Sequence, residues 1–172
     1  HGASTPGKPE TNGKAEQIVR SVKKGTTCNL LQSGLEYGYW PHAMRHFASM
    51  HNFTYVISEL NNRFNTRTPY HAKFGTNVQA HLIPFGARCE WLPHGKNIKQ
   101  GMKKFGKKTR DGIFVGYKIN MGMGWSKQYL VIDAEKFKNT PANRKAHVYA
   151  TQEIYKLQEL TFPVKEGLWN PL

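Results

Sequence analysis

The hydrophobic pattern of this chain changes its period near residue 82. Before that point apolar residues recur every three or four positions, which is the spacing of an amphipathic helix. After it, short runs of β-branched and aromatic residues are separated by Gly, Pro and Lys, which is typical of strands joined by turns. Because helices come first and strands second, without alternation, the pattern predicts an α+β fold.

Two long helices and one short helix are expected in the first part. The apolar spacing and the turn residues that flank it predict a helix over about 12–33, with Gly34 as its C′ residue. A broad apolar stripe predicts a second helix over 39–61. A single helical turn over 70–74 should end at Gly75.

The second part predicts a small antiparallel barrel. Four or five short strands within about 75 residues are typical of an SH3-sized β-barrel. The clearest strand runs are 87–92, 113–117, 128–132 and 146–149. We therefore divide the chain into a helical part (1–75), a linker (76–83), a β-barrel (84–156) and a tail (157–172).

The charge of the chain points to its partners. It has 25 Lys and Arg against 11 Asp and Glu, a net charge of +14, which favours polyanions such as nucleic acid or an anionic membrane surface. No apolar run approaches the roughly 18 residues of a spanning helix, and we expect no membrane partner. The stretch 96–110 contains no acid, and an extended loop of this kind would contact phosphates without sequence preference. Its central cations are Lys103, Lys104, Lys107 and Lys108.

Few residues suit acid-based or metal chemistry. No Asp precedes Asp111, so a carboxylate active site in the first half would be sparse or incomplete. Cys28 and Cys89 form neither a disulfide framework nor a Cys-x-x-Cys metal pair. His42 and His46 stand four apart on an expected helix and could bind zinc. Because no Glu follows His42 and neither cysteine is close in sequence, we interpret both as core or surface histidines.

Five motifs follow one another along residues 1–155. The first, HGASTPGKPETNGKAE, has the form H-x-x-S-x-P-x-x-P-x-x-N-G-x-x-E. The others are Leu35 with Trp40, TPYHAKFG (68–75), FGARC (85–89) and GIFVGY (112–117). In this order they resemble integrases of copia-type retrotransposons, whose corresponding segments read SGLP…FW, TPYEAWFG, FGCRAYV and GIFVGY after the same opening loop.

The resemblance implies the end of an RNase H-like catalytic core followed by an SH3-like β-barrel, both from a Pol polyprotein. The complete enzyme of this family is a D,D,E polynucleotidyl transferase that integrates element DNA by metal-dependent strand transfer. Glu16 falls at the third acid of the triad, which would help to hold Mg²⁺ or Mn²⁺. The two aspartates would precede His1, so this chain alone is expected to be inactive and to hold no metal tightly.

Four cations accompany Glu16 on the expected helix: Lys14, Arg20, Lys23 and Lys24. The last three lie four, seven and eight residues after the acid, on the same helical face. Beside a metal-holding acid, such cations suit a track for a phosphate backbone. The plainer alternative is a solvated face on which Glu16 complements the helix dipole, worth about 0.3–1 kcal/mol.

The resemblance also implies partners and a location. These are DNA (element ends and target), a homo-oligomer in the complete integrase, and a nuclear or virus-like-particle setting. An alternative from another class is a non-catalytic basic nucleic-acid-binding module, a degenerate or domesticated remnant of such an element. This module would keep the positive charge that binds nucleic acid and would lack strand-transfer activity.

Overall fold

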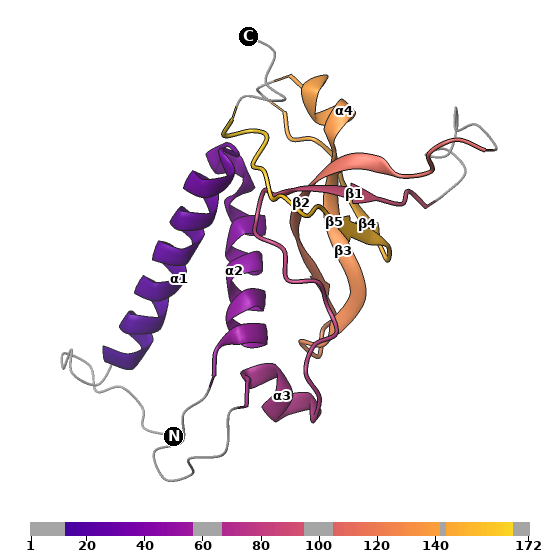
Figure 1. Ribbon diagram of the computed structural model, residues 1–172. Coiled ribbons are helices and arrows are strands. Elements are labelled where there is room, and N and C mark those ends of the chain that lie inside the picture. Colours follow the sequence, from indigo (N-terminus) through magenta and orange to yellow (C-terminus); the bar gives the residue numbers. More distant parts are fainter. Residues whose placement is uncertain (1–12, 57–66, 95–104, 142–143, 167–172) are drawn as a thin grey trace.

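The computed structural model describes residues 13–56, 67–94, 105–141 and 144–166. Helices come first and an antiparallel sheet follows, which confirms the α+β class (Figure 1). The elements are α1 (Gly13–Ser33), the 3-10 helix η2 (Tyr37–Tyr39), α2 (Trp40–Thr54), α3 (Pro69–Phe74), β1 (Arg88–Trp91), β2 (Arg110–Ile119), β3 (Trp125–Asp133), α4 (Ala134–Lys138), β4 (Val148–Thr151) and β5 (Ile154–Lys156).

Two of the expected helix ends are confirmed, and glycine explains both. Gly34 has a φ of 70°, and its N–H donates to the carbonyl of Leu30 at 3.0 Å. Gly75 ends α3 with a φ of 74°. Only glycine adopts this left-handed conformation without steric cost, so each helix stops where the sequence predicts. At the other end of α3, the hydroxyl of Thr68 accepts the N–H of His71 at 3.1 Å.

The second helix is shorter than predicted. We expected it to reach residue 61, but α2 ends at Thr54 and Tyr55 is extended, with a ψ of 126°. Among its described residues Phe53 is the last side chain that reaches the core, whereas Tyr55 and Val56 are 54% and 47% exposed. Because most helical stability in proteins comes from packing, a further turn without burial gains little.

The five strands form one antiparallel sheet in the order β4-β3-β2-β1-β5. The long strand β2 lies at its centre and carries irregularities between Phe114 and Gly116 and between Tyr117 and Ile119. Such irregularities bend a strand and increase its twist. Strands β4 and β5 are the two edges, and the strand pairs of the described residues leave the sheet open.

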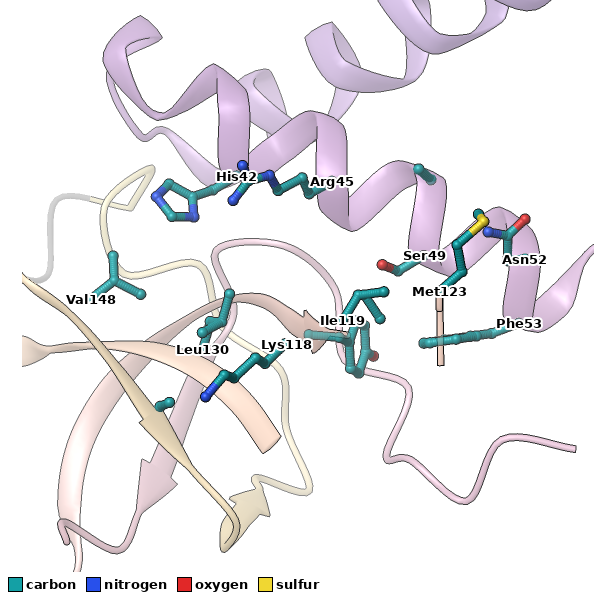
Figure 2. Close-up of a pocket in the computed structure, with 13 residues that line it drawn as sticks. His42, Arg45, Ser49, Asn52, Phe53, Lys118, Ile119, Met123, Leu130 and Val148 are labelled. Atoms are coloured by element: carbon teal, nitrogen blue, oxygen red, sulfur yellow. The ribbon is translucent and has the colours of Figure 1, made fainter. Parts of the chain in front are cut away.

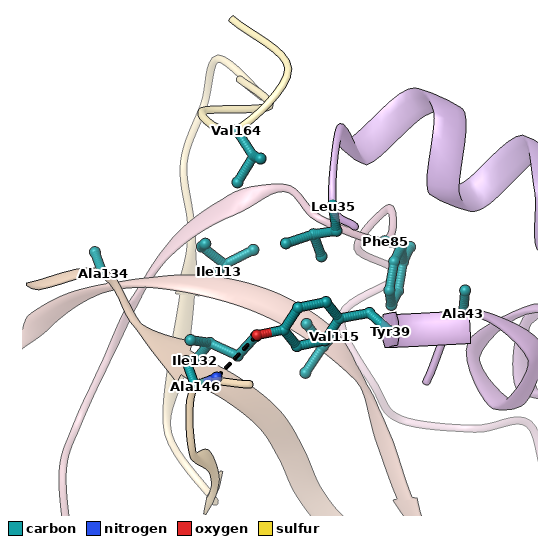
Figure 3. Close-up of a cluster of buried hydrophobic side chains, with 10 residues drawn as sticks. All are labelled: Leu35, Tyr39, Ala43, Phe85, Ile113, Val115, Ile132, Ala134, Ala146 and Val164. Carbon is teal, nitrogen blue, oxygen red and sulfur yellow. Dashed lines mark hydrogen bonds between the residues drawn. The ribbon is translucent and has the colours of Figure 1, made fainter. Parts of the chain in front are cut away.

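One face of the sheet packs against the helices. Tyr39, Ala43 and Phe85 join Ile113 and Val115 in a buried cluster, drawn in Figure 3. The hydroxyl of Tyr39 also accepts the backbone N–H of Ala146 at 3.0 Å. Both sides of the expected boundary at 76–83 therefore contribute to one core.

The segments assigned to a linker (76–83) and a tail (157–172) are packed against the rest of the fold in their described parts. Ile83 is fully buried, and its N–H donates to the Tyr117 hydroxyl at 3.1 Å. Val164 lies in the core cluster, and the carbonyl of Thr161 accepts the N–H of Arg88 at 2.9 Å. Proline and glycine in 161–172 indicated a tail, and within its described part Val164 is buried because apolar side chains gain free energy by leaving water.

Candidate nucleic-acid interface

Glu16 lies in the first turn of α1 with two of the predicted cations beside it. Its side chain, together with Arg20 and Lys23, lines a shallow hollow on the helix surface. The helical period brings these three together, as the sequence predicts. Lys14 and Lys24 are exposed on the same helix but do not line the hollow.

The N-terminal half of α1 has no packing partner among the described residues. All residues from 13 to 21 are exposed, and Ile18 and Val19 are 65% and 52% exposed. The contacts with α2 lie further along: the Asn29 side chain donates to the carbonyl of Ala43 at 3.0 Å. In Figure 1 the two helices diverge toward the N-terminal end of α1. This half of the helix therefore presents uncovered apolar side chains together with its cations.

The described residues do not by themselves make a Mg²⁺ site at Glu16. Two-metal strand transfer needs several carboxylates around ions about 3.5–4 Å apart. Glu16 is the one carboxylate that lines the hollow, and no group of three or more His, Cys, Asp or Glu side chains in the described part could hold a metal ion. A two-metal site at Glu16 would need further carboxylates from outside the described residues.

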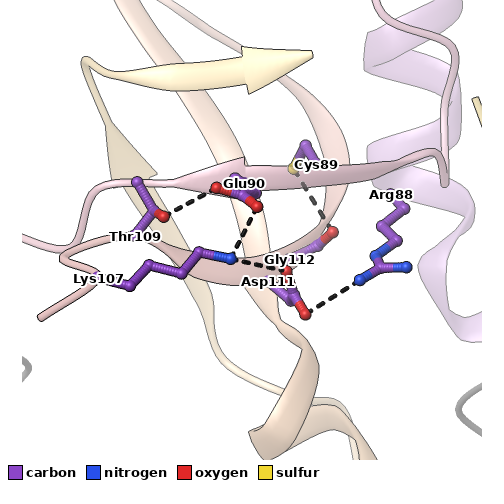
Figure 4. A network of polar contacts seen from close by, with 7 residues as sticks. All are labelled: Arg88, Cys89, Glu90, Lys107, Thr109, Asp111 and Gly112. Carbon is purple, nitrogen blue, oxygen red and sulfur yellow. Dashed lines mark hydrogen bonds and ion pairs between the residues drawn. The ribbon is translucent and has the colours of Figure 1, made fainter. Parts of the chain in front are cut away.

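The structure describes only residues 105–110 of the basic stretch 96–110. Lys103 and Lys104 lie outside the described residues. Lys107 is tied to the sheet: its Nζ donates to Glu90 Oε1 at 2.7 Å and lies 3.9 Å from Asp111 Oδ1 (Figure 4). Lys108 is exposed and belongs to none of the ion pairs formed within the described ranges.

The network around Lys107 compensates its charge. The hydroxyl of Thr109 donates to the second oxygen of Glu90 at 2.8 Å. The hydrogen bonds from Lys107 and Thr109 lower the pKa of the Glu90 carboxyl and keep it ionised. Arg88 pairs with Asp111 at 3.2 Å, so cations and carboxylates alternate along this hairpin. Of the two described lysines predicted to bind DNA here, Lys108 is the one left to contact phosphates.

A groove that the sequence analysis missed lies between α2 and the sheet (Figure 2). Its volume is about 660 Å³. His42, Arg45 and Lys118 stand on its walls, and the side chains of Leu130 and Val148 form part of its floor. Burial lowers the pKa of His42, and the positive charges of Arg45 and Lys145 lower it further. No carboxylate lines the groove, so the charged side chains of its lining, Arg45 and Lys118, are both positive.

His46 is a core histidine, one of the two placements that the sequence left open. It is 3% exposed, and its Nε2 lies 3.0 Å from the carbonyl of Ile83, which can only accept. Nε2 therefore carries the proton, and Nδ1 accepts from the amide of Asn29 at 3.2 Å. Burial lowers the pKa of His46 to about 4. His46 is thus a neutral structural link between the two helices and the segment before β1.

Three large aromatic residues of the strands form part of the core and offer no open ring face to a nucleobase. Trp91, Tyr117 and Tyr129 are between 1% and 4% exposed.

No helix in the described residues is long and apolar enough to cross a membrane. Comparison of the chain with protein-family models, with curated proteins and with solved structures found no match.

Proposed function

We propose that this chain is part of a copia-type retrotransposon integrase. It would contain the end of the RNase H-like core followed by an SH3-like domain, and it would bind DNA in the nucleus or in a virus-like particle. In the complete enzyme, a homo-oligomer, Glu16 would be the third acid of the D,D,E triad. Mg²⁺ or Mn²⁺ would then supply the Lewis acid for strand transfer.

The observation that carries the proposal is the uncovered N-terminal half of α1. Ile18 and Val19 expose apolar surface on the helix that also bears Glu16. Exposed apolar side chains of this size favour burial against another element. A helix that brings the third acid to two aspartates must pack on the sheet that carries them. The exposure of α1 supports such a partner in the complete protein.

The sheet supports the second half of the proposal. Strands β1 to β4 follow one another in the sheet, and β5 returns beside β1, a connectivity that suits a small SH3-like barrel. Two motif glycines have structural roles. Gly86 has a φ of 79° and donates its N–H to Phe114 at 2.8 Å, and Gly116 lies at the irregularity of β2 with a φ of 141°. These positions require glycine for conformational reasons.

The proposed roles on α1 follow from charge and spacing. Glu16 would offer carboxylate oxygens to a divalent cation, because hard cations prefer oxygen ligands. Arg20 and Lys23 line the same hollow and would hold the phosphate backbone next to the reacting bond. Lys14 and Lys24, exposed on the flanks of the helix, would extend that track.

The test uses the complete integrase, with its catalytic core restored ahead of residue 1. Glu16→Gln keeps the side-chain size and removes the charge, so strand transfer should fall by orders of magnitude while DNA affinity stays within a few-fold. Glu10→Gln is the matched control and should change neither quantity. If Glu10 proves essential and Glu16 does not, the assignment of the motif is wrong.

A non-catalytic basic nucleic-acid-binding module remains the second candidate. It is favoured by one observation, namely that Glu16 is the single acid among the residues lining its hollow. In that case Glu16→Gln changes nothing, whereas replacing Arg20 and Lys23 still weakens DNA binding. The same set of variants therefore separates the two functions.

A further inference from the structure

The groove between α2 and the sheet carries cations and no compensating acid. Arg45 comes from α2 and Lys118 from β2, and both side chains are exposed. Neither belongs to an ion pair formed among the described residues. Lys145 adds to the positive field near His42. Charge complementarity therefore requires an anionic occupant.

The floor of the groove is aliphatic. Leu130, Val148 and Ala150 come from the two neighbouring strands β3 and β4. The aromatic residues of the lining, Phe53 and Tyr117, are only 7% and 4% exposed, so neither ring offers a face to a base. Binding of single-stranded nucleic acid depends on such stacking platforms. The floor suits aliphatic side chains better than nucleobases.

One end of the groove has an adaptable apolar rim. Met123 and Ile119 line it and are 56% and 37% exposed. Met123 lies in the turn between β2 and β3 and has a φ of 64°. Methionine side chains are flexible and polarisable, and they are used on surfaces that accept varied partners. The groove thus combines cationic walls with an apolar floor and an apolar end.

We propose that this groove binds an acidic amphipathic segment of another protein. Aliphatic side chains of the segment pack on Leu130, Val148 and Ala150, and its carboxylates pair with Arg45 and Lys118. A helix or an extended peptide that buries an apolar face in a groove is a common mode of recognition. The proposal goes beyond DNA binding, and it stands even if the chain is not an integrase.

The test begins with a random peptide library displayed on phage. The library is selected on the full chain and counter-selected on the charge-reversed variant Arg45→Glu/Lys118→Glu. We expect selected sequences to alternate Asp or Glu with Leu, Ile or Val. A library that yields no binder, or yields basic binders, contradicts the proposal.

Affinity is then measured by fluorescence polarisation with one labelled peptide from the selection. Arg45→Glu/Lys118→Glu should weaken binding at least tenfold. The control Lys156→Glu/Lys165→Glu changes the charge equally at residues that do not line the groove, and it should weaken binding less than twofold. Met123→Asn removes the apolar rim with a residue that tolerates a positive φ, and it should weaken binding several-fold.

Two further measurements test the proposal on the unmodified chain, so that a misfolded variant does not decide the outcome. Amide shifts of the unmodified chain should move at Ala48, Ile119 and Ala150 when the peptide is added, because these residues line the groove. A labelled oligothymidylate should bind without displacing the peptide. If the oligonucleotide displaces it and depends on the same two cations, the groove is a nucleic-acid site and the peptide proposal fails.

Discussion

His46 is a buried titratable side chain whose ring contacts an amide and a backbone carbonyl, and no described carboxylate pairs with it. Its pKa is lowered from 6.5 to about 4 by burial, so the unfolded chain binds the proton more tightly than the folded one. The stabilising contribution is complete above the unfolded value and is lost as the pH falls toward 4. We expect the free energy of unfolding to drop by about 2 kcal/mol between about pH 7.5 and pH 5.

Urea unfolding at a series of pH values measures this loss. His46→Gln removes the titrating group, so the variant should start less stable near neutral pH and lose less on acidification. The control is His42→Gln, because the pKa of His42 is also lowered but this residue is only half buried. An unchanged acid loss in His46→Gln would show that other groups control the pH dependence.

Lys107 and Lys108 are neighbours with different surroundings, and they form a matched pair. The charge of Lys107 is compensated by Glu90 and Asp111, whereas that of Lys108 is not compensated in the described structure. Lys108→Gln should therefore reduce the slope of log K against log salt for duplex DNA by roughly 0.9, and Lys107→Gln by much less. Fluorescence anisotropy over a salt series measures both slopes, and equal effects would contradict the structural distinction.

Helix α1 is the element in which sequence and structure agree best. Its limits follow from local signals, and the adjacency of Glu16, Arg20 and Lys23 follows from 3.6 residues per turn. The end of α2 had no comparable signal. The apolar stripe continues past Thr54, and only the position of the sheet decides which residues of that stripe are buried.

The cations of α1 should act on DNA as a group. Replacing Arg20, Lys23 and Lys24 with Gln should lower affinity for unrelated duplex sequences to a similar extent and reduce the salt slope by roughly 2 to 3. The triple variant Lys138→Gln/Lys156→Gln/Lys165→Gln removes the same charge from other elements and serves as the control. Equal losses in both triple variants would mean that net charge, rather than the helix face, controls binding.

At the scale of the whole molecule, helices and sheet share their core. Removing the helices would expose Phe85, Ile113 and Val115, all at most 1% exposed in the full chain. We therefore expect residues 84–172 alone to bind a hydrophobic dye and to melt without a cooperative transition. A chain shortened by residues 1–20 should keep its melting temperature within a few degrees, because the described part of that segment buries nothing. A cooperative transition in 84–172 would show that this part folds by itself and would support the expected boundary at 76–83.

The sequence by itself determined the order of helices and strands, the glycine-terminated ends of α1 and α3, and the charges that surround Glu16. These features depend on period, conformational preference and composition, all of which act over a few residues. Only the tertiary structure decided the end of α2, the burial of Ile83 and Val164, the pairing of Lys107 and the groove beside Arg45. The burials and the groove depend on which distant residues exclude water together, and the pairing of Lys107 with Glu90 depends on β1 lying beside β2. Such long-range neighbours have no local signal in the chain.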